Sequence, residues 1–265
     1  MNIVITGSTR GIGLGMAQEF LKRSHNVMIS SRNSTAVSNT VADLRARFPS
    51  RLVAGSSADV SDYDQVQRLW DDSIEALEAV DMWVNNAGTD TVNAMFDKLP
   101  PEDIATTVNT NLLGLMNCNR VAIPGMNNQG SGWIFNMEGF GSDGRVLPKK
   151  GPYGATKYAV RYFTKSMIRE CENTPVNVGY LSPGIVVTDL LVPPPGERGE
   201  QWEQTKQVLN ILADTVDTVT PFLVEGMLAA DKNGAAVRWL TTGKIASRFL
   251  MSRFRKRDVF GPLGL

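Results

Sequence analysis

Two neighbouring segments carry side chains that could transfer a proton. Residues 153 to 157 read YGATK, so a tyrosine is followed by a lysine one helical turn later on the same face. Free tyrosine titrates near ~10, and donation near neutral pH asks for a pKa lower by about two or three units, worth roughly 3 to 4 kcal/mol. An ammonium about 4 Å away supplies on the order of 4 kcal/mol. Tyr153 and Lys157 therefore predict a general acid activated by its lysine, although such pairs also occur on ordinary helices.

The preceding segment, IFNMEGFGSDG at residues 134 to 144, reads as an apolar strand that ends in glycines. A proton donor of this kind normally works beside a second polar group on the substrate oxygen. Glu138 is a poor general base, because an unpaired carboxylate in a dry cleft is costly, and a solvated or capping acid is favoured. Ser142 is the single hydroxyl of the segment.

A glycine-rich stretch, TGSTRGIG at residues 6 to 13, follows the first apolar run and opens a segment of helical period. Glycines let the backbone approach a pyrophosphate, and a helix N-terminus offers free N–H groups and positive potential. An ordinary tight turn has the same composition, but the place at the first strand-to-helix junction favours a dinucleotide site. The predicted cofactor contacts are Gly7, Ser8, Thr9, Arg10, Gly11, Ile12 and Gly13.

The end of the second predicted strand, MISSRN, bears on the choice of cofactor. NAD enzymes place an acid there against the ribose hydroxyls, whereas NADP enzymes place a cation. Ser31 and Arg32 stand at that point, and Arg10 adds a second guanidinium that can bind a 2′-phosphate, unless either arginine is simply solvated. The pattern favours NADPH over NADH. After the third strand, Asp59 beside Val60 is a candidate acceptor for the adenine amino group or a helix cap.

Short β-branched runs alternate with helical segments to about residue 184. This order is typical of βαβ units with a parallel sheet covered on both faces, and it predicts one α/β domain over residues 1 to 265. The predicted strands span residues 2–6, 26–30, 51–55, 80–86, 132–137, 176–182 and 236–242.

Composition narrows the remaining function classes. The chain has 265 residues, two cysteines and one histidine, which predicts neither a disulfide framework nor a metal site of histidine and cysteine, and suits a reducing compartment. The first residues already read as a strand, so no targeting segment is expected, and no window is long enough to span a membrane. We expect a cytoplasmic protein. Sequence features of nucleic-acid binding are absent, so nucleic acid is not an expected partner.

The C-terminal tail, residues 244 to 265, is distinct in charge. From Val237 onward there are seven basic residues against one acid, although the net charge of the chain is zero. Within KIASRFLMSRFRKR, residues 244 to 257, Ile245, Phe249, Leu250 and Phe254 lie near one predicted helix face. This predicts either a peripheral helix on anionic lipid or a docking or subunit-interface helix.

Four further motifs follow in order: NNAG at 85 to 88, NLLG at 111 to 114, YGATK at 153 to 157 and SPGIVVTD at 182 to 189. Together with TGSTRGIG they resemble the short-chain dehydrogenase/reductase family over nearly the whole chain. The resemblance implies a single-domain Rossmann fold of seven parallel strands, a homodimer or homotetramer, and hydride transfer between a nicotinamide and a carbonyl group.

The resemblance also implies a role for each matching residue. Tyr153 would protonate the substrate oxygen, Lys157 would also bind the nicotinamide ribose, and Asn111 would relay protons through a water. The family's substrate lid would cover about residues 190 to 215, where Leu190 and Leu191 offer an apolar wall or pack on the core as part of a surface crossover. The further cofactor contacts implied are Asn86, Ala87, Gly88, Pro183, Gly184, Ile185 and Thr188.

One position departs from the family. Its members carry a serine at the end of the fifth strand, where this chain has Gly139 or, counting back from Tyr153, Phe140. Three substitutes are open: Ser142 swings in from the next turn, backbone N–H groups of residues 138 to 141 serve instead, or Tyr153 acts alone.

The segment FNMEGFGSDGR, with YGATK and LSPGIVVTDLL, resembles the chlorophyll b reductase branch of the family, which also lacks the serine. This implies NADPH-dependent reduction of the C7 formyl group of chlorophyll b to hydroxymethyl, on a large apolar substrate at a thylakoid membrane. An aldehyde needs less polarisation than a ketone, which would make the missing serine tolerable. The alternatives are reduction of another carbonyl (sugar, acyl or steroid-like) and an inactive NADPH-sensing protein, which would not need Tyr153 and Lys157.

Overall fold

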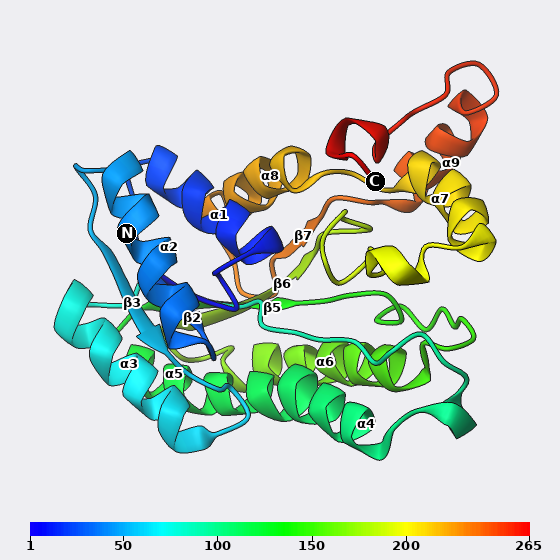
Figure 1. The fold of residues 1–265 in the computed structure, drawn as a ribbon. Helices are drawn as coiled ribbons and strands as arrows, with labels where there is room; N and C mark the ends of the chain where they lie inside the picture. Colours follow the sequence, from blue (N-terminus) through cyan, green and yellow to red (C-terminus); the bar gives the residue numbers. More distant parts are fainter.

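Seven parallel strands form one sheet in the order β3-β2-β1-β4-β5-β6-β7 (Figure 1). The computed structural model describes the backbone of residues 1–265 and all side chains except those of Glu197 and Gln201. The strand order reverses between β1 and β4, and ligands of such sheets bind at this switch point, beyond the carboxyl ends of the strands. The strands are β1 (Asn2–Thr6), β2 (Asn26–Ser31), β3 (Val53–Ser57), β4 (Met82–Asn85), β5 (Gly132–Met137), β6 (Val176–Ser182) and β7 (Ala236–Arg238). The predicted Rossmann fold is confirmed.

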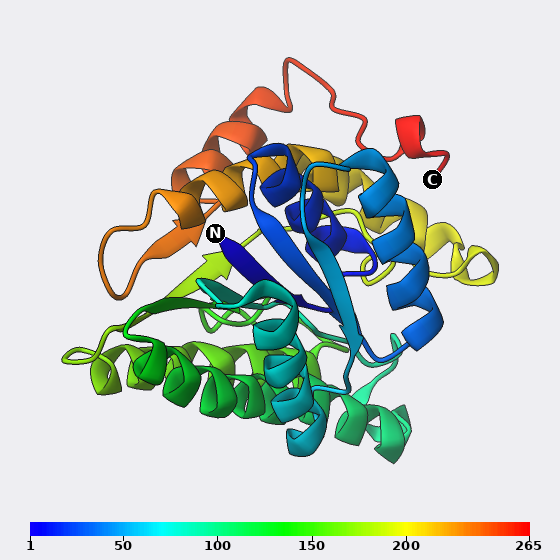
Figure 2. The ribbon, with the colours of Figure 1, turned by 90° about the vertical axis from the view of Figure 1, so that its left-hand side faces the viewer.

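Helices cover both faces of the sheet, as Figure 2 shows. Helices α1, α2 and α8 cover one face, and α3, α5 and α6 cover the other (Figure 1). Each layer encloses its own apolar core, one around Phe20 and Phe135 and one around Trp70 and Trp83. The helices are α1 (Gly11–Lys22), α2 (Ser34–Arg47), α3 (Tyr63–Leu77), α4 (Pro101–Val108), α5 (Gly114–Gln129), α6 (Gly151–Glu170), α7 (Glu200–Leu212), α8 (Val216–Leu228) and α9 (Thr242–Met251). Shorter turns are η1 (Phe96–Lys98), the π-helical η2 (Asn109–Leu113), η3 (Pro195–Glu197) and η4 (Gly261–Leu263).

The predicted bounds match the structure for β1, β5 and β6. β5 and β6 have the predicted bounds, because buried parallel strands read as continuous apolar runs. β7 ends early, at Arg238, because Thr241 caps the next helix by accepting a hydrogen bond from the N–H of Lys244 at 3.2 Å. The predicted tail helix is correspondingly displaced to 242–251.

A third apolar cluster lies apart from the two layers. It joins α7 to the end of the chain through Trp202 and Phe260, whose rings meet edge to face at 5.6 Å. Figures 1 and 2 both show the C-terminal segment close to α7. The segment after the sheet and the chain terminus therefore form one packed unit.

Candidate active site

Helix α6 brings Tyr153 and Lys157 together at the carboxyl end of β5. The ammonium of Lys157 donates a hydrogen bond to the carbonyl of Met137 at 3.1 Å and is buried. It lies 5.8 Å from the centre of the Tyr153 ring. The phenol hydroxyl forms no hydrogen bond with any side chain or backbone group that the structure describes, which leaves it free for a substrate oxygen.

The pKa of Tyr153 differs from the prediction. Burial raises this pKa well above its ordinary value, and the carboxylate of Asp90 raises it further. Burial also lowers the pKa of Lys157 to about 8, against an opposing effect of Glu138. The predicted net lowering of the Tyr153 pKa is therefore not found in the chain alone, because burial penalises the phenolate. Tyr153 is a neutral phenol, which is the form that can give up a proton.

Gly139 lies directly beneath the Tyr153 hydroxyl. A Cβ atom added to Gly139 would come within 3.0 Å of that oxygen and 3.1 Å from both Cγ and Cε of Lys157. Real Cβ atoms essentially never approach another atom more closely than 3.0 Å. The tyrosine thus occupies the space that a serine side chain would need.

Ser142 does not replace the missing serine. Its hydroxyl accepts a hydrogen bond from the N–H of Gly139 at 3.0 Å and donates one to the carbonyl of the same residue. Only 3% of Ser142 is exposed, so the expectation that it swings toward the substrate is wrong. The N–H groups of Phe140 and Gly141 have no backbone partner among the described residues.

Glu138 is buried, contrary to the prediction of a solvated or capping acid. The Nε of Arg161 lies 3.6 Å from its Oε1, and Nη1 of the same arginine donates to the carbonyl of Ser142 at 3.4 Å. Burial raises the pKa of Glu138, and Arg161 opposes this most strongly. Arg161 therefore holds both ends of the turn from Glu138 to Ser142.

Asn111 lies in the π-helical turn η2, a distortion that is frequent at functional sites. Its side chain accepts from the N–H of Thr89 and donates to the carbonyl of Thr89, both at 2.8 Å, and it also donates to Thr156 Oγ1 at 3.2 Å. A Cβ on Gly88 would be 3.4 Å from Asn111 Oδ1 and 3.8 Å from Lys157 Nζ. Two of the three predicted catalytic side chains, Asn111 and Lys157, therefore lie beside Gly88.

The glycine loop after β1 has the shape of a phosphate cradle. Arg10 is the N-cap residue of α1, and its side chain does not cap the helix. The first N–H groups of the helix therefore have no side-chain partner there. Gly13 packs closely against Gly7, so a Cβ added to Gly13 would collide with the carbonyl oxygen of Gly7. Asn86 fixes the loop by donating to the carbonyls of Thr6 and Gly7, both at 2.9 Å. These features fit a pyrophosphate.

Ser8 has another role than the predicted cofactor contact. Its hydroxyl donates to the carbonyl of Ile5 at 2.7 Å and accepts from the N–H of Ser30 at 2.9 Å. Its own N–H donates to the carbonyl of Ser30 at 2.9 Å. Ser8 therefore ties β1 to β2 from inside the fold.

Asp59 is not a helix cap. It accepts hydrogen bonds from the N–H and the hydroxyl of Ser61 at 2.9 and 2.7 Å, whereas Asp62 caps α3 through the N–H of Gln65 at 3.1 Å. Its proposed contact with adenine stays a prediction.

The region around the end of β2 fits a 2′-phosphate. Arg32 is exposed beside Ser31 at the strand end, and its side chain makes no ion pair or hydrogen bond with a described residue. Arg10 pairs with Asp189 at 3.2 Å, with both side chains more than three-quarters exposed. Such surface pairs contribute about 0 to 1 kcal/mol, so a phosphate can displace the carboxylate. Thr188 lies opposite, 3.5 Å from a Cβ placed on Gly11.

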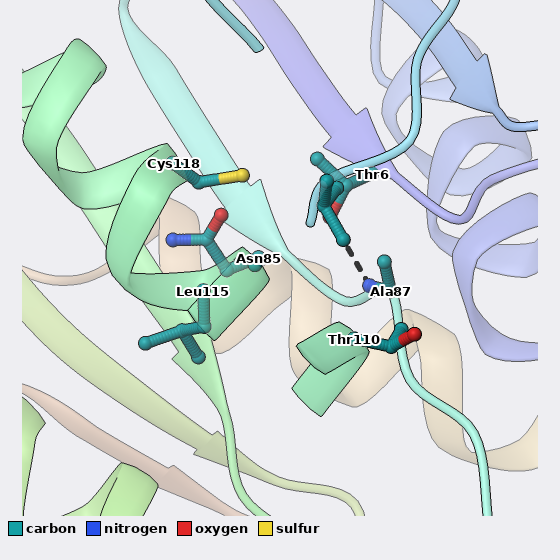
Figure 3. Close-up of a pocket in the computed structure, with 8 residues that line it drawn as sticks. Thr6, Asn85, Ala87, Thr110, Leu115 and Cys118 are labelled. Atoms are coloured by element: carbon teal, nitrogen blue, oxygen red, sulfur yellow. Dashed lines mark hydrogen bonds between the residues drawn. The ribbon is translucent and has the colours of Figure 1, made fainter. Parts of the chain in front are cut away.

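Figure 3 shows residues that line a recess too small to hold a water molecule. The N–H of Ala87 donates to Thr6 Oγ1 across it at 3.1 Å. Val60, a predicted adenine neighbour, also lines the recess, whereas Tyr153 does not. The recess belongs to the cofactor side of the site.

An exposed apolar rim lies on the loops at the carboxyl edge of the sheet, and apart from Leu190 it was not predicted from the sequence as a substrate surface. It lies on the loops that follow β4, β5 and β6, and Phe96, with 68% exposed, is typical of it. Irregular loops have no period that separates such residues from core residues. Of the two leucines for which an apolar wall and packing on the core were both open, Leu190 is exposed and Leu191 packs into the third apolar cluster. The rim consists of Val92, Met95, Phe96, Phe140, Val146, Leu147 and Leu190.

The fold and the site define an oxidoreductase. The family model for short chain dehydrogenase matches residues 1–195, and the chain belongs to the short-chain dehydrogenase/reductase family. Solved structures agree: a gluconate 5-dehydrogenase from Burkholderia cenocepacia J2315, in complex with NADP and tartrate, has 26% identity and a TM-score of 0.75 over 93% of this chain and 95% of that one.

Within this family the chain is similar to chlorophyll(ide) b reductases. It is 40% identical to chlorophyll(ide) b reductase NOL, chloroplastic, from Oryza sativa subsp. japonica, over 93% of this chain and 73% of the relative. It is 34% identical to the probable chlorophyll(ide) b reductase NYC1, chloroplastic, from Arabidopsis thaliana, where it spans 99% of its own length but 55% of the relative. The predicted resemblance to this branch is confirmed.

Proposed function

We propose that this oxidoreductase uses NADPH to reduce an aldehyde on a large apolar molecule, with the 7-formyl group of chlorophyll(ide) b as substrate. The observation that carries the proposal is the free hydroxyl of Tyr153, which lies among three loops with exposed apolar side chains. Similarity to reductases of the same pigment over most of the chain supports the substrate.

NADPH, when bound, supplies the hydride that reaches the carbonyl carbon. Tyr153 gives its phenolic proton to the carbonyl oxygen, so the aldehyde becomes a hydroxymethyl group. The Lys157 ammonium stabilises the phenolate that remains, and Asn111 lies where it can help return a proton through water. The free N–H groups of Phe140 and Gly141 orient the oxygen in place of a serine hydroxyl.

The preference for NADPH is part of the proposal. Arg32 at the end of β2 and Arg10 in the glycine loop provide two exposed guanidinium groups, and the end of β2 carries no acid of its own. A 2′-phosphate would gain charge-assisted hydrogen bonds there, whereas a ribose hydroxyl would have no carboxylate at that strand end to accept its proton.

We also propose a peripheral membrane contact for the tail. Helix α9 turns Ile245 and Arg248 inward, while Leu250 and Phe254 are 61% and 81% exposed. Arg253, Arg255 and Lys256 are exposed nearby, which suits anionic lipid. Among the described residues, no helix is both long enough and apolar enough to cross a bilayer.

The protein would act at the surface of the pigment-bearing membrane as a homodimer or homotetramer. Sedimentation in solution can test this oligomeric state.

The decisive assay follows NADPH oxidation with chlorophyll b, chlorophyllide b and simple aldehydes, using Tyr153→Phe as the inactive control. Pigment turnover well above that of the simple aldehydes supports the proposal. The panel includes a steroid ketone and an acyl ketone, because the chain is also 32% identical over 190 residues to a 3alpha-hydroxysteroid dehydrogenase from Mediterraneibacter gnavus. Preferential turnover of either ketone, or tight NADPH binding with no turnover, would contradict it.

A further inference from the structure

Asp214 connects the substrate side of the site to the end of the chain. It is 4% exposed and follows α7. Its carboxylate accepts hydrogen bonds from Trp239 Nε1 at 2.6 Å, from Arg248 Nη2 at 3.0 Å and from Arg257 Nη2 at 2.6 Å. All three donors come from the stretch that follows β7. One buried carboxylate thus binds three side chains of the C-terminal segment.

The backbone of Asp214 binds the loop that was predicted to hold the nicotinamide carboxamide. The N–H of Asp214 donates to the carbonyl of Ile185 at 3.0 Å, and the N–H of Val187 donates to the carbonyl of Asp214 at 2.9 Å. These two bonds form a parallel bridge centred on Val186. Any displacement of Asp214 therefore acts directly on residues 185 to 187.

The two arginines also bind the last carbonyls of α7. Arg248 donates to Leu212 at 2.8 Å, and Arg257 donates to Ile211 at 2.6 Å and to Ala213 at 2.9 Å. Positive charges are favourable at a helix C-terminus, where carbonyl groups lack partners within the helix. The C-terminal segment therefore fixes where α7 ends.

Apolar packing completes the unit. Val259 and Phe260 are buried against Trp202 and Leu209 of α7 and against Val187. The N–H of Val259 donates to Asn210 Oδ1 at 2.7 Å. This cluster is separate from both cores of the sheet, so it can loosen without unfolding them.

We propose that residues 239 to 265 form a functional part of the substrate lid. Asp214 is the positioning residue through which they hold the loop at 183 to 188. The inference rests on the proposed function, because this loop and α7 border the cofactor and substrate. Asp214 touches neither the hydroxyl of Tyr153 nor the ammonium of Lys157. It acts by keeping the loop and the end of α7 in one arrangement.

Arg257→Met tests this inference with Arg255→Met as the matched control. Both variants remove one cation from the same segment. The side chain of Arg255 is exposed and makes no ion pair or hydrogen bond with a described residue, whereas Arg257 binds Asp214. Hydrogen exchange of the Val187 and Asp214 amides, measured without substrate, should quicken about tenfold in Arg257→Met and stay unchanged in Arg255→Met. The KM for NADPH should rise by a similar factor, with kcat at saturation within about threefold of the wild type.

Arg257→Lys keeps the charge but cannot match the geometry of a guanidinium, so it should restore part of both effects. If Arg257→Met fails to fold, Trp239→Phe removes a single hydrogen bond to Asp214 and should still quicken exchange of the Val187 amide. Wild-type exchange and KM in these variants would overturn the inference, as would a loss of kcat with KM unchanged. Quickened exchange in a protein that reduces no pigment would overturn the proposed substrate alone, because the exchange is measured without it.

Discussion

The hydroxyl of Tyr153 occupies the space above the Cα of Gly139 that a side chain at residue 139 would need. The position of the proton donor and the absence of the serine are thus linked, because the phenol fills the space that the serine side chain would need. The absence of a side chain on Gly139 allows the phenol to lie against the end of β5, next to Lys157. An added serine would have to displace the proton donor before it could help to bind the carbonyl.

Gly139→Ser should therefore lower activity, although it restores the family pattern. We expect kcat to fall at least about tenfold, because small displacements of a reacting group cost that much or more. Gly139→Ala adds the same Cβ without the hydroxyl and should be equally impaired. Gly154→Ala is the matched control, since a Cβ there meets open space, and it should leave kcat unchanged. A Gly139→Ser enzyme faster than the wild type would contradict the arrangement.

Lys157 should make stability depend on pH in the alkaline range. Its pKa is lowered from 10.5 to about 8 by burial, so between these values the unfolded chain binds more protons than the folded one. The free energy of unfolding should rise with pH across this window, by up to roughly 3 kcal/mol, relative to Lys157→Met. Urea unfolding of both proteins at pH 7.5, 8.5 and 9.5 measures the difference. A constant or falling difference would show that the lysine is not buried as described.

Arg161 should stabilise the turn from Glu138 to Ser142. Arg161→Met leaves the buried carboxylate of Glu138 without its cation, which should cost about 2 to 3 kcal/mol in the free energy of unfolding. The pKa of Glu138 is already raised by burial and should rise further, so the loss should be present at neutral pH and should disappear as pH falls through this raised pKa toward 4.5.

The double variant Glu138→Gln, Arg161→Met should recover much of that stability, because the unpaired charge is gone. Chemical denaturation at pH 7 and at pH 4.5 distinguishes the cases. Equal losses in the single and double variants at both pH values would mean that the ion pair has no such role.

Arg32 should set the cofactor preference. Arg32→Asp should raise the KM for NADPH about tenfold to a hundredfold through lost charge-assisted hydrogen bonds, and should improve the use of NADH. Arg68→Asp, an exposed substitution on α3, is the control for the general change in charge. An unchanged ratio of kcat/KM for the two cofactors in Arg32→Asp would remove Arg32 from the site.

Local patterns predicted the fold well because parallel strands that are buried on both faces read as apolar runs, as β5 and β6 do. The spacing of Tyr153 and Lys157 predicted that these two side chains lie together, whereas Asn111 was implied only by the family resemblance. Local patterns did not predict Ser142 bound within its own turn or Glu138 buried beside Arg161, because both depend on how the chain folds back.

The contacts of the C-terminal tail were also missed, because they join residues that are far apart in the sequence. The charge of the tail suggested one basic surface, yet Arg248 and Arg257 bind Asp214, which lies 34 and 43 residues earlier in the chain. Hydrophobic periodicity placed Ile245 and Phe254 on one face, whereas the helix ends at Met251 and leaves Phe254 exposed. Sequence separation hides such contacts from any local pattern.

The most direct test of the central claim is the single-turnover rate of Tyr153→Phe with NADPH and the pigment aldehyde. Removal of a general acid costs about 100-fold to 10,000-fold in rate, so we predict a loss in this range together with wild-type affinity for NADPH. Unimpaired turnover by Tyr153→Phe would contradict the account, since the proton would then have another source.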